Sequence, residues 1–186
     1  MWNEQIIMML LEGIKDTLYM TLTSTLIGYV IGLPMGILLT VTDKDGIHPN
    51  TAVYKVLDVI ANLIRSVPFL ILLIVLIPFT RFLIGRSYGP TATIVPLVIA
   101  AAPYIARMVE SSLKEVDAGV IEAARSMGAS NFTIVTKVML VEARTSLIVG
   151  ATISLGTILG YSAMAGTVGG CLLYTSPSPR DVEESR

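Results

Sequence analysis

The feature that most constrains the fold is a run of 26 residues without a charge, Thr17 to Thr42. A helix needs about 20 apolar residues to cross a bilayer, so this run can span a membrane with some tilt. Only 15% of the chain is charged, too little to cover a soluble domain. The sequence therefore predicts an all-α polytopic membrane protein with four membrane helices, at about 17–42, 60–81, 87–106 and 145–165.

Lys and Arg residues predict the orientation, because they are enriched in short cytoplasmic connections. The two longer connections hold eight of them, and the opposite side with the tail holds five. The first group is Lys44, Lys55, Arg65, Arg107, Lys114, Arg125, Lys137 and Arg144; the second is Lys15, Arg81, Arg86, Arg180 and Arg186. We therefore expect both longer connections in the cytoplasm and the N-terminus outside.

Glycines and prolines punctuate the apolar runs. Gly28, Gly32 and Gly36 share one helix face, as do Gly156 and Gly160, and such faces let helix backbones approach closely in lipid. They fit a subunit interface and packing within one chain equally well. Prolines at positions 34, 68, 78, 96 and 103 predict kinks.

Several function classes are disfavoured. One cysteine, Cys171, and one histidine, His48, offer no internal disulfide and no Cys/His metal cluster. The chain has no GxxxxGK[ST] phosphate loop and no catalytic trio, so we expect neither an enzyme nor a cofactor in this chain. A net charge of −1 gives no field for nucleic acid. The 17–42 and 147–164 stretches contain no Asp, Glu, Lys, Arg or His, which argues against a secondary transporter.

A short amphipathic helix is predicted at about 117–128. Asp117 can cap its start, and Gly128 suits the left-handed residue that ends a helix. One face carries small or apolar side chains, the other Glu122, Arg125 and Ser126. Small side chains favour docking against protein, whereas lipid-binding helices carry Trp, Phe and Leu.

The same segment resembles the EAA signature of ABC importer permeases. Glu122-Ala123-Ala124 is followed after three residues by Gly128, and Leu140 lies at the expected distance. Val138 replaces the usual isoleucine, and Val141 stands where proline is expected, which puts a kink before the fourth span in doubt. Four further stretches resemble the permease subunits of methionine-type ABC importers: RSVPF (65–69), IPFTR (77–81), AAPYIARMVE (101–110) and GYSAMAGTVGG (160–170).

The resemblance implies a type I ABC permease fold in the bacterial inner membrane. It implies a homodimer, two separate ATP-binding subunits that bind ATP and Mg²⁺, and an extracytoplasmic methionine-binding lipoprotein. The 117–128 helix would be the coupling helix that docks on the ATPase. Its contact residues would be Val120, Glu122, Ala123, Ala124, Arg125 and Gly128. The alternative cargo is another small amino acid or organic solute.

Two further predictions concern the path and the tail. Tyr161, Ser162 and Met164 could line a lightly polar substrate path, or simply pack the helix. Arg65 could attract a carboxylate, or anchor its helix at the cytoplasmic interface. Residues 171–186 are rich in Ser, Pro and charge. We interpret the chain as truncated before the family's fifth membrane helix, with these residues as a foreign tail. The alternative is a natural outward tail that is disordered by composition.

Overall fold

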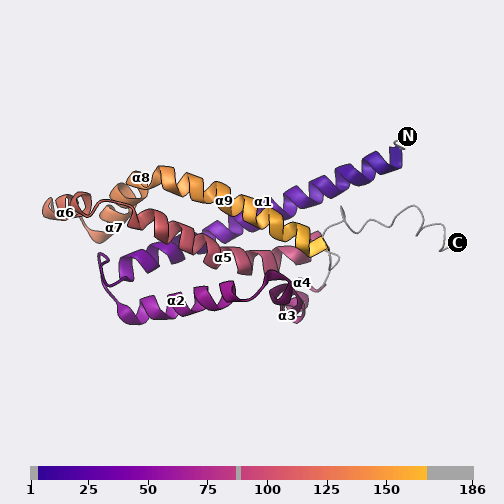
Figure 1. Cartoon of the computed structure of the whole chain (residues 1–186), viewed down its shortest axis with the longest axis horizontal. Coiled ribbons are helices and arrows are strands. Elements are labelled where there is room, and N and C mark those ends of the chain that lie inside the picture. Colours follow the sequence, from indigo (N-terminus) through magenta and orange to yellow (C-terminus); the bar gives the residue numbers. More distant parts are fainter. Residues whose placement is uncertain (1–3, 87–88, 167–186) are drawn as a thin grey trace.

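The structure, a computed structural model, describes residues 4–86 and 89–166, and these form helices joined by short connections (Figure 1). The predicted tail, 171–186, where we expect the family's fifth helix to be missing, lies outside the described residues. The helices are α1 (Glu4–Thr42), α2 (Thr51–Ser66), α3 (Phe69–Val75), α4 (Ile77–Ile84), α5 (Pro90–Lys114), α6 (Ala118–Ser126), α7 (Asn131–Thr133), the π-helical turn η1 (Ile134–Met139), α8 (Leu140–Glu142) and α9 (Arg144–Ala165).

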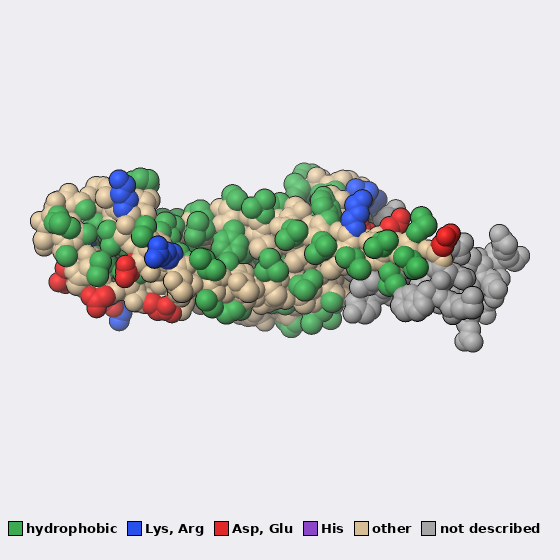
Figure 2. All heavy atoms as spheres, turned by 90° about the horizontal axis from the view of Figure 1, so that it is seen from above, with side chains coloured by type: hydrophobic (Ala, Val, Ile, Leu, Met, Phe, Trp, Pro, Cys, Tyr) green, Lys and Arg blue, Asp and Glu red, His purple; other side chains and the backbone are tan. Residues whose placement is uncertain are grey.

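Three long helices, α1, α5 and α9, form the body of the molecule. In their most apolar stretches α5 is 72% buried, against 33% for α1 and 22% for α9. The central helix is therefore α5, with the other two packed along it. The face of the molecule in Figure 2 carries its charged side chains toward its two ends and hydrophobic side chains between them, as expected for a body that crosses a bilayer.

The glycine face of α1 packs inside this chain. A Cβ on Gly32 would lie 2.7 Å from the carbonyl oxygen of Ala102, and one on Gly36 would lie 2.6 Å from that of Ala106. Both distances are too short for a real side chain, so these glycines let α1 contact the backbone of α5. Within the described residues, a Cβ on Gly156 or Gly160 would meet nothing within 4 Å.

The second predicted span, 60–81, is not one straight helix; it covers the end of α2, all of α3 and part of α4. The helical segment begins earlier, as α2 at Thr51, and turns by 101° into α3. Pro68 causes the turn, because it has no N–H to donate and forces Val67 into an extended conformation (φ −84°, ψ 125°). The described chain therefore has three helices long enough to cross a membrane, or four if the bent pair counts as one span.

The other three helices agree more closely with the sequence. The 17–42 stretch lies within α1, the 87–106 stretch ends inside α5, and α9 begins one residue before 145. The chain breaks before α9 even though Val141 is not proline. Ala143, with ψ near 0°, separates α8 from α9, and the π-helical turn η1 precedes it.

Candidate functional site

The predicted cytoplasmic helix is α6, and its two ends form as the sequence indicates. The backbone N–H of Gly119 donates to the Asp117 carboxylate at 2.8 Å, which caps the start. At the other end Gly128 has φ +80°, and the N–H of Ala129 donates to the carbonyl of Ala124 at 3.1 Å. These contacts fix a rigid nine-residue helix at the end of the molecule opposite the N-terminus (Figure 1).

The two faces of α6 have different surroundings. Val120, Ala123 and Met127 are exposed, Met127 by 82%, and their spacing places them on one face. We call these three residues the α6 stripe. Ala124 is 5% exposed and belongs to the chain's own core. Its predicted role as a partner contact therefore does not suit its side chain, which instead holds α6 against the body.

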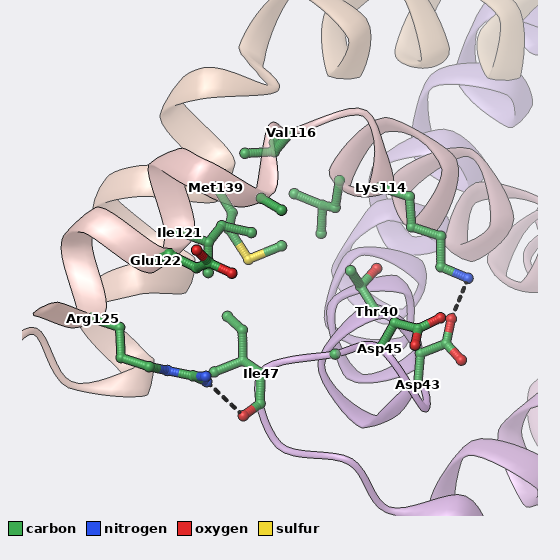
Figure 3. Close-up of a pocket in the computed structure, with 13 residues that line it drawn as sticks. Thr40, Asp43, Asp45, Ile47, Lys114, Val116, Ile121, Glu122, Arg125 and Met139 are labelled. Carbon is green, nitrogen blue, oxygen red and sulfur yellow. Dashed lines mark hydrogen bonds and ion pairs between the residues drawn. The ribbon is translucent and has the colours of Figure 1, made fainter.

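Glu122 and Arg125, the predicted polar contacts, line a cavity of about 500 Å³ between α6 and the rest of the chain (Figure 3). Arg125 donates from its guanidinium to the carbonyl oxygen of Ile47 at 2.9 Å. Ile47 lies in the connection between α1 and α2. Arg125 therefore ties α6 to the α1–α2 connection of its own chain.

An ion-pair network joins the start of the α1–α2 connection to α2 and α5 close to this cavity. Lys114 contacts Asp43 at 2.6 Å and Glu110 at 2.8 Å. Glu110 also contacts Arg107 at 2.7 Å, and Arg107 pairs with Asp58 of α2. None of these contacts was predicted from the sequence. The sequence pattern that could have indicated them is the spacing of Arg107, Glu110 and Lys114, which places three charges on one helix face.

Hydrogen bonding to Lys114 is the main reason that the pKa of Asp43 lies below its ordinary value; a backbone bond from Lys44 and the two lysine charges add to this, against a smaller effect of burial. Because the folded state lowers this pKa, the ion pair stabilises the fold above the pKa of the unfolded chain, about 3.9. That contribution disappears as the pH falls through the lower, folded value. At neutral pH the ion pair between Asp43, directly after α1, and Lys114 of α5 is therefore fully formed.

The three residues predicted to line a substrate path have separate environments. Tyr161 stacks on Phe69, with ring centroids 4.8 Å apart and an interplanar angle of 10°. Ser162 is buried and donates its hydroxyl to the carbonyl of Leu159 at 2.7 Å, so it packs the helix. Met164 is 47% exposed. Of the three, Tyr161 lines a cavity.

That cavity, of about 170 Å³, lies beneath the bend between α2 and α3. Its lining includes Arg65, Phe69, Ala100, Tyr104 and Tyr161. It thus brings together side chains of the consecutive helices α2 and α3 with side chains of α5 and α9, which lie much later in the sequence. Among the residues that the structure describes, no group of three His, Cys, Asp or Glu side chains could hold a metal ion.

Comparison with known proteins identifies the family to which a chain with these features belongs. Residues 8–180 match the family model described as "Binding-protein-dependent transport system inner membrane component". The chain belongs to this family. It is 50% identical over 164 residues to the D-methionine transport system permease protein MetI of Salmonella typhimurium (strain LT2), which covers 88% of this chain and 76% of the relative. The MetI protein of Escherichia coli (strain K12) gives the same identity and coverage.

Solved structures agree on the family's fold. A structure described as "Inward facing conformations of the MetNI methionine ABC transporter" is 49% identical and superposes with a TM-score of 0.89, covering 91% of this chain and 79% of the other. A crystal structure of an amino acid ABC transporter has a TM-score of 0.75 at 23% identity, covering 97% of this chain and 80% of the other. This second likeness shows the fold alone. The chain is therefore a type I ABC permease, as predicted.

Proposed function

We propose that this chain is the membrane-spanning permease subunit of an ATP-driven importer of methionine. Relatives that are 50% identical over most of the chain are D-methionine permeases, and the structure superposes on a methionine ABC transporter. The chain itself supplies no phosphate-binding loop. ATP and Mg²⁺ would be bound by two copies of a separate ATPase subunit.

The α6 stripe is the observation that carries the coupling role. Its exposed apolar side chains, Val120, Ala123 and Met127, lie at the end of the molecule beyond the membrane helices (Figure 1). Phe132, 78% exposed, adds to the apolar surface of the same region. We expect the bilayer to surround the long apolar helices and to leave this end in water, so a protein partner is the natural occupant. We assign the stripe to the ATPase, with Gly128 shaping the helix end and Glu122 beside the contact.

Motion of a docked α6 can pass into the membrane helices through the contacts described above. The bond from Arg125 to Ile47 ties α6 to the α1–α2 connection. The network from Asp43 through Lys114 and Arg107 ties that connection to α5 and α2. Closure of the ATPase subunits would then move α1, α2 and α5 together. Access would alternate between the two sides, with substrate shifting the balance only through unequal affinity for the two states.

The assembly would contain a second copy of this permease, with the translocation path between the copies. A methionine-binding lipoprotein would deliver substrate from outside, on the side of the N-terminus of α1. The chain would lie in the bacterial inner membrane with that N-terminus outward, which the Lys and Arg distribution supports. Among the residues predicted to line the path, Tyr161 is the one we retain.

The test introduces a charge into the stripe. Ala123→Glu or Met127→Glu should abolish both ATPase co-purification and methionine uptake, because an unpaired carboxylate would be desolvated in the contact. Ala118→Glu is the matched control: it makes the same change on the opposite face of α6, toward the cavity. Unchanged co-purification for both stripe variants would contradict the docking role. A wild-type complex that takes up another amino acid but no methionine would contradict the cargo.

A further inference from the structure

The cavity beneath the α2–α3 bend lies at the middle of the membrane-spanning body. Residues of α2 contact α5 in reverse order: Tyr54 bonds Glu110 at 3.4 Å, Asn62 bonds Arg107 at 3.0 Å, and Arg65 shares the cavity with Tyr104 and Ala100. The helix α2 therefore runs antiparallel to α5 from its cytoplasmic end. By Arg65 it has reached the centre of α5.

The packing of α1 gives the same depth independently. A Cβ on Gly28 would lie 3.2 Å from the Cβ of Ala101, the neighbour of the cavity residue Ala100. Gly28 lies 11 residues after Thr17 and 14 before Thr42, which is ~16 and ~21 Å along the uncharged run. Arg65 therefore lies level with the middle of that run. It is not at the cytoplasmic interface, which was one of the two expectations from the sequence.

A cation at this depth needs a polar environment, since an unpaired arginine in lipid is costly. Arg65 is exposed on the surface of the single chain. Within residues 4–86 and 89–166 its side chain has no hydrogen bond or ion pair, whereas Arg107, on the facing helix, is fully engaged with Asp58 and Glu110. We therefore expect the guanidinium of Arg65 to face water or the translocation path and not lipid. Its charge is then available to an anionic group.

The chemistry of the lining fits a zwitterion with an apolar tail. Arg65 can bind a carboxylate in the planar, two-point manner that a guanidinium favours. The adjacent carboxyl end of α2 carries the partial negative charge that an ammonium group prefers. The stacked pair Phe69 and Tyr161 offers ring edges and faces, which contact thioether sulfur favourably. Drug-sized ligands occupy roughly 300–1,000 Å³, so about 170 Å³ suits a single amino acid.

We propose that this cavity is an intermediate binding site for the transported amino acid, where Arg65 holds the carboxylate and the Phe69–Tyr161 pair contacts the thioether. The proposal rests on the proposed function and adds the site to it. The break at Pro68 fits this site, because a discontinuous helix near the membrane centre exposes its backbone polar groups to substrate.

The test uses the complete importer, reconstituted in vesicles with its ATPase and binding protein. Arg65→Gln should lower labelled methionine uptake by about tenfold or more, while ATP hydrolysis and complex assembly stay within about twofold. Arg65→Lys keeps the charge and should retain more uptake than Arg65→Gln. Lys55→Gln is the matched control, since it removes a positive charge from the same helix ten residues away, outside the cavity.

A second measurement uses photo-methionine, which keeps the ammonium and carboxylate groups and carries a diazirine in place of the thioether. On illumination it should label the segment around Phe69 or Tyr161 in the wild type and in Lys55→Gln, with loss of label in Arg65→Gln. Normal uptake by Arg65→Gln, or wild-type labelling only elsewhere, would overturn the site and leave the proposed function standing. A wild-type importer that transports no methionine would overturn both.

Discussion

Gly32 and Gly128 are both glycines for a physical reason, and the two reasons differ. At Gly32 the backbone is an ordinary helix, and the neighbouring carbonyl of Ala102 leaves no room for a Cβ. At Gly128 there is room, since nothing lies within 4 Å, but φ is +80°, which costs other residues about 1–2 kcal/mol. The sequence indicated the second role from its place after a helix. It could not tell which helix the first one faces.

The close approach at Gly32 gives a prediction for stability. Gly32→Ala should lower the free energy of unfolding by about 1–3 kcal/mol, the usual cost of overpacking, because α1 must move away from the backbone of α5. Thermal unfolding of the intact complex in detergent would measure this. Gly156→Ala, where a Cβ meets no atom within 4 Å among the described residues, is the control and should unfold at the wild-type temperature or above. Equal midpoints for wild type and Gly32→Ala would contradict the packing.

At the scale of helices, the sequence predicts features that depend on neighbouring residues better than features that depend on packing between distant helices. The ends of α6 follow from Asp117 and Gly128, whose effects act within a few residues. The bend at Pro68 was expected only as a kink, because its 101° turn depends on how α3 packs. For Arg65 the sequence left two roles open, a carboxylate contact and an anchor at the cytoplasmic interface. The depth that we infer for it comes from the pairing of α2 with α5, which no local pattern encodes.

The ion network makes a prediction at this scale. The side chain of Glu110 is 6% exposed and accepts from both Arg107 and Lys114. Glu110→Gln would leave two cations sharing one fewer carboxylate, and breaking a buried pair costs about 3–5 kcal/mol. The unfolding midpoint of the complex should fall, and uptake should fall with it because α2 and α5 no longer move together.

The matched control for that variant is Asp45→Asn. Asp45 also pairs with a lysine, Lys44 at 3.8 Å, but both side chains are more than four-fifths exposed, and such surface pairs contribute ~1 kcal/mol or less. Its midpoint should stay at the wild-type value. Similar losses for Glu110→Gln and Asp45→Asn would mean that the network is an ordinary surface feature with no part in joining the helices.

At the scale of the whole molecule, the proposed mechanism needs two separate ends, one for the ATPase and one for substrate delivery. The N-terminus of α1 and the α6 helix lie at opposite ends (Figure 1), and the uncharged run Thr17–Thr42 lies between them. In the orientation that we propose from the Lys and Arg distribution, the stripe faces the ATPase in the cytoplasm. The first residues of α1 then face the substrate-delivering side.

That orientation can be tested directly with single cysteines in a Cys171→Ser background. Glu12→Cys, in α1 five residues before the uncharged run, should react with a membrane-impermeant maleimide in intact spheroplasts. Met127→Cys, 82% exposed on α6, should react only after the membrane is opened, because the bilayer keeps the reagent from the cytoplasm. Adding the ATPase to opened membranes should then slow labelling of Met127→Cys and leave Glu12→Cys unchanged. Reaction of Met127→Cys in intact spheroplasts would show the opposite orientation, in which a cytoplasmic ATPase could not reach the stripe.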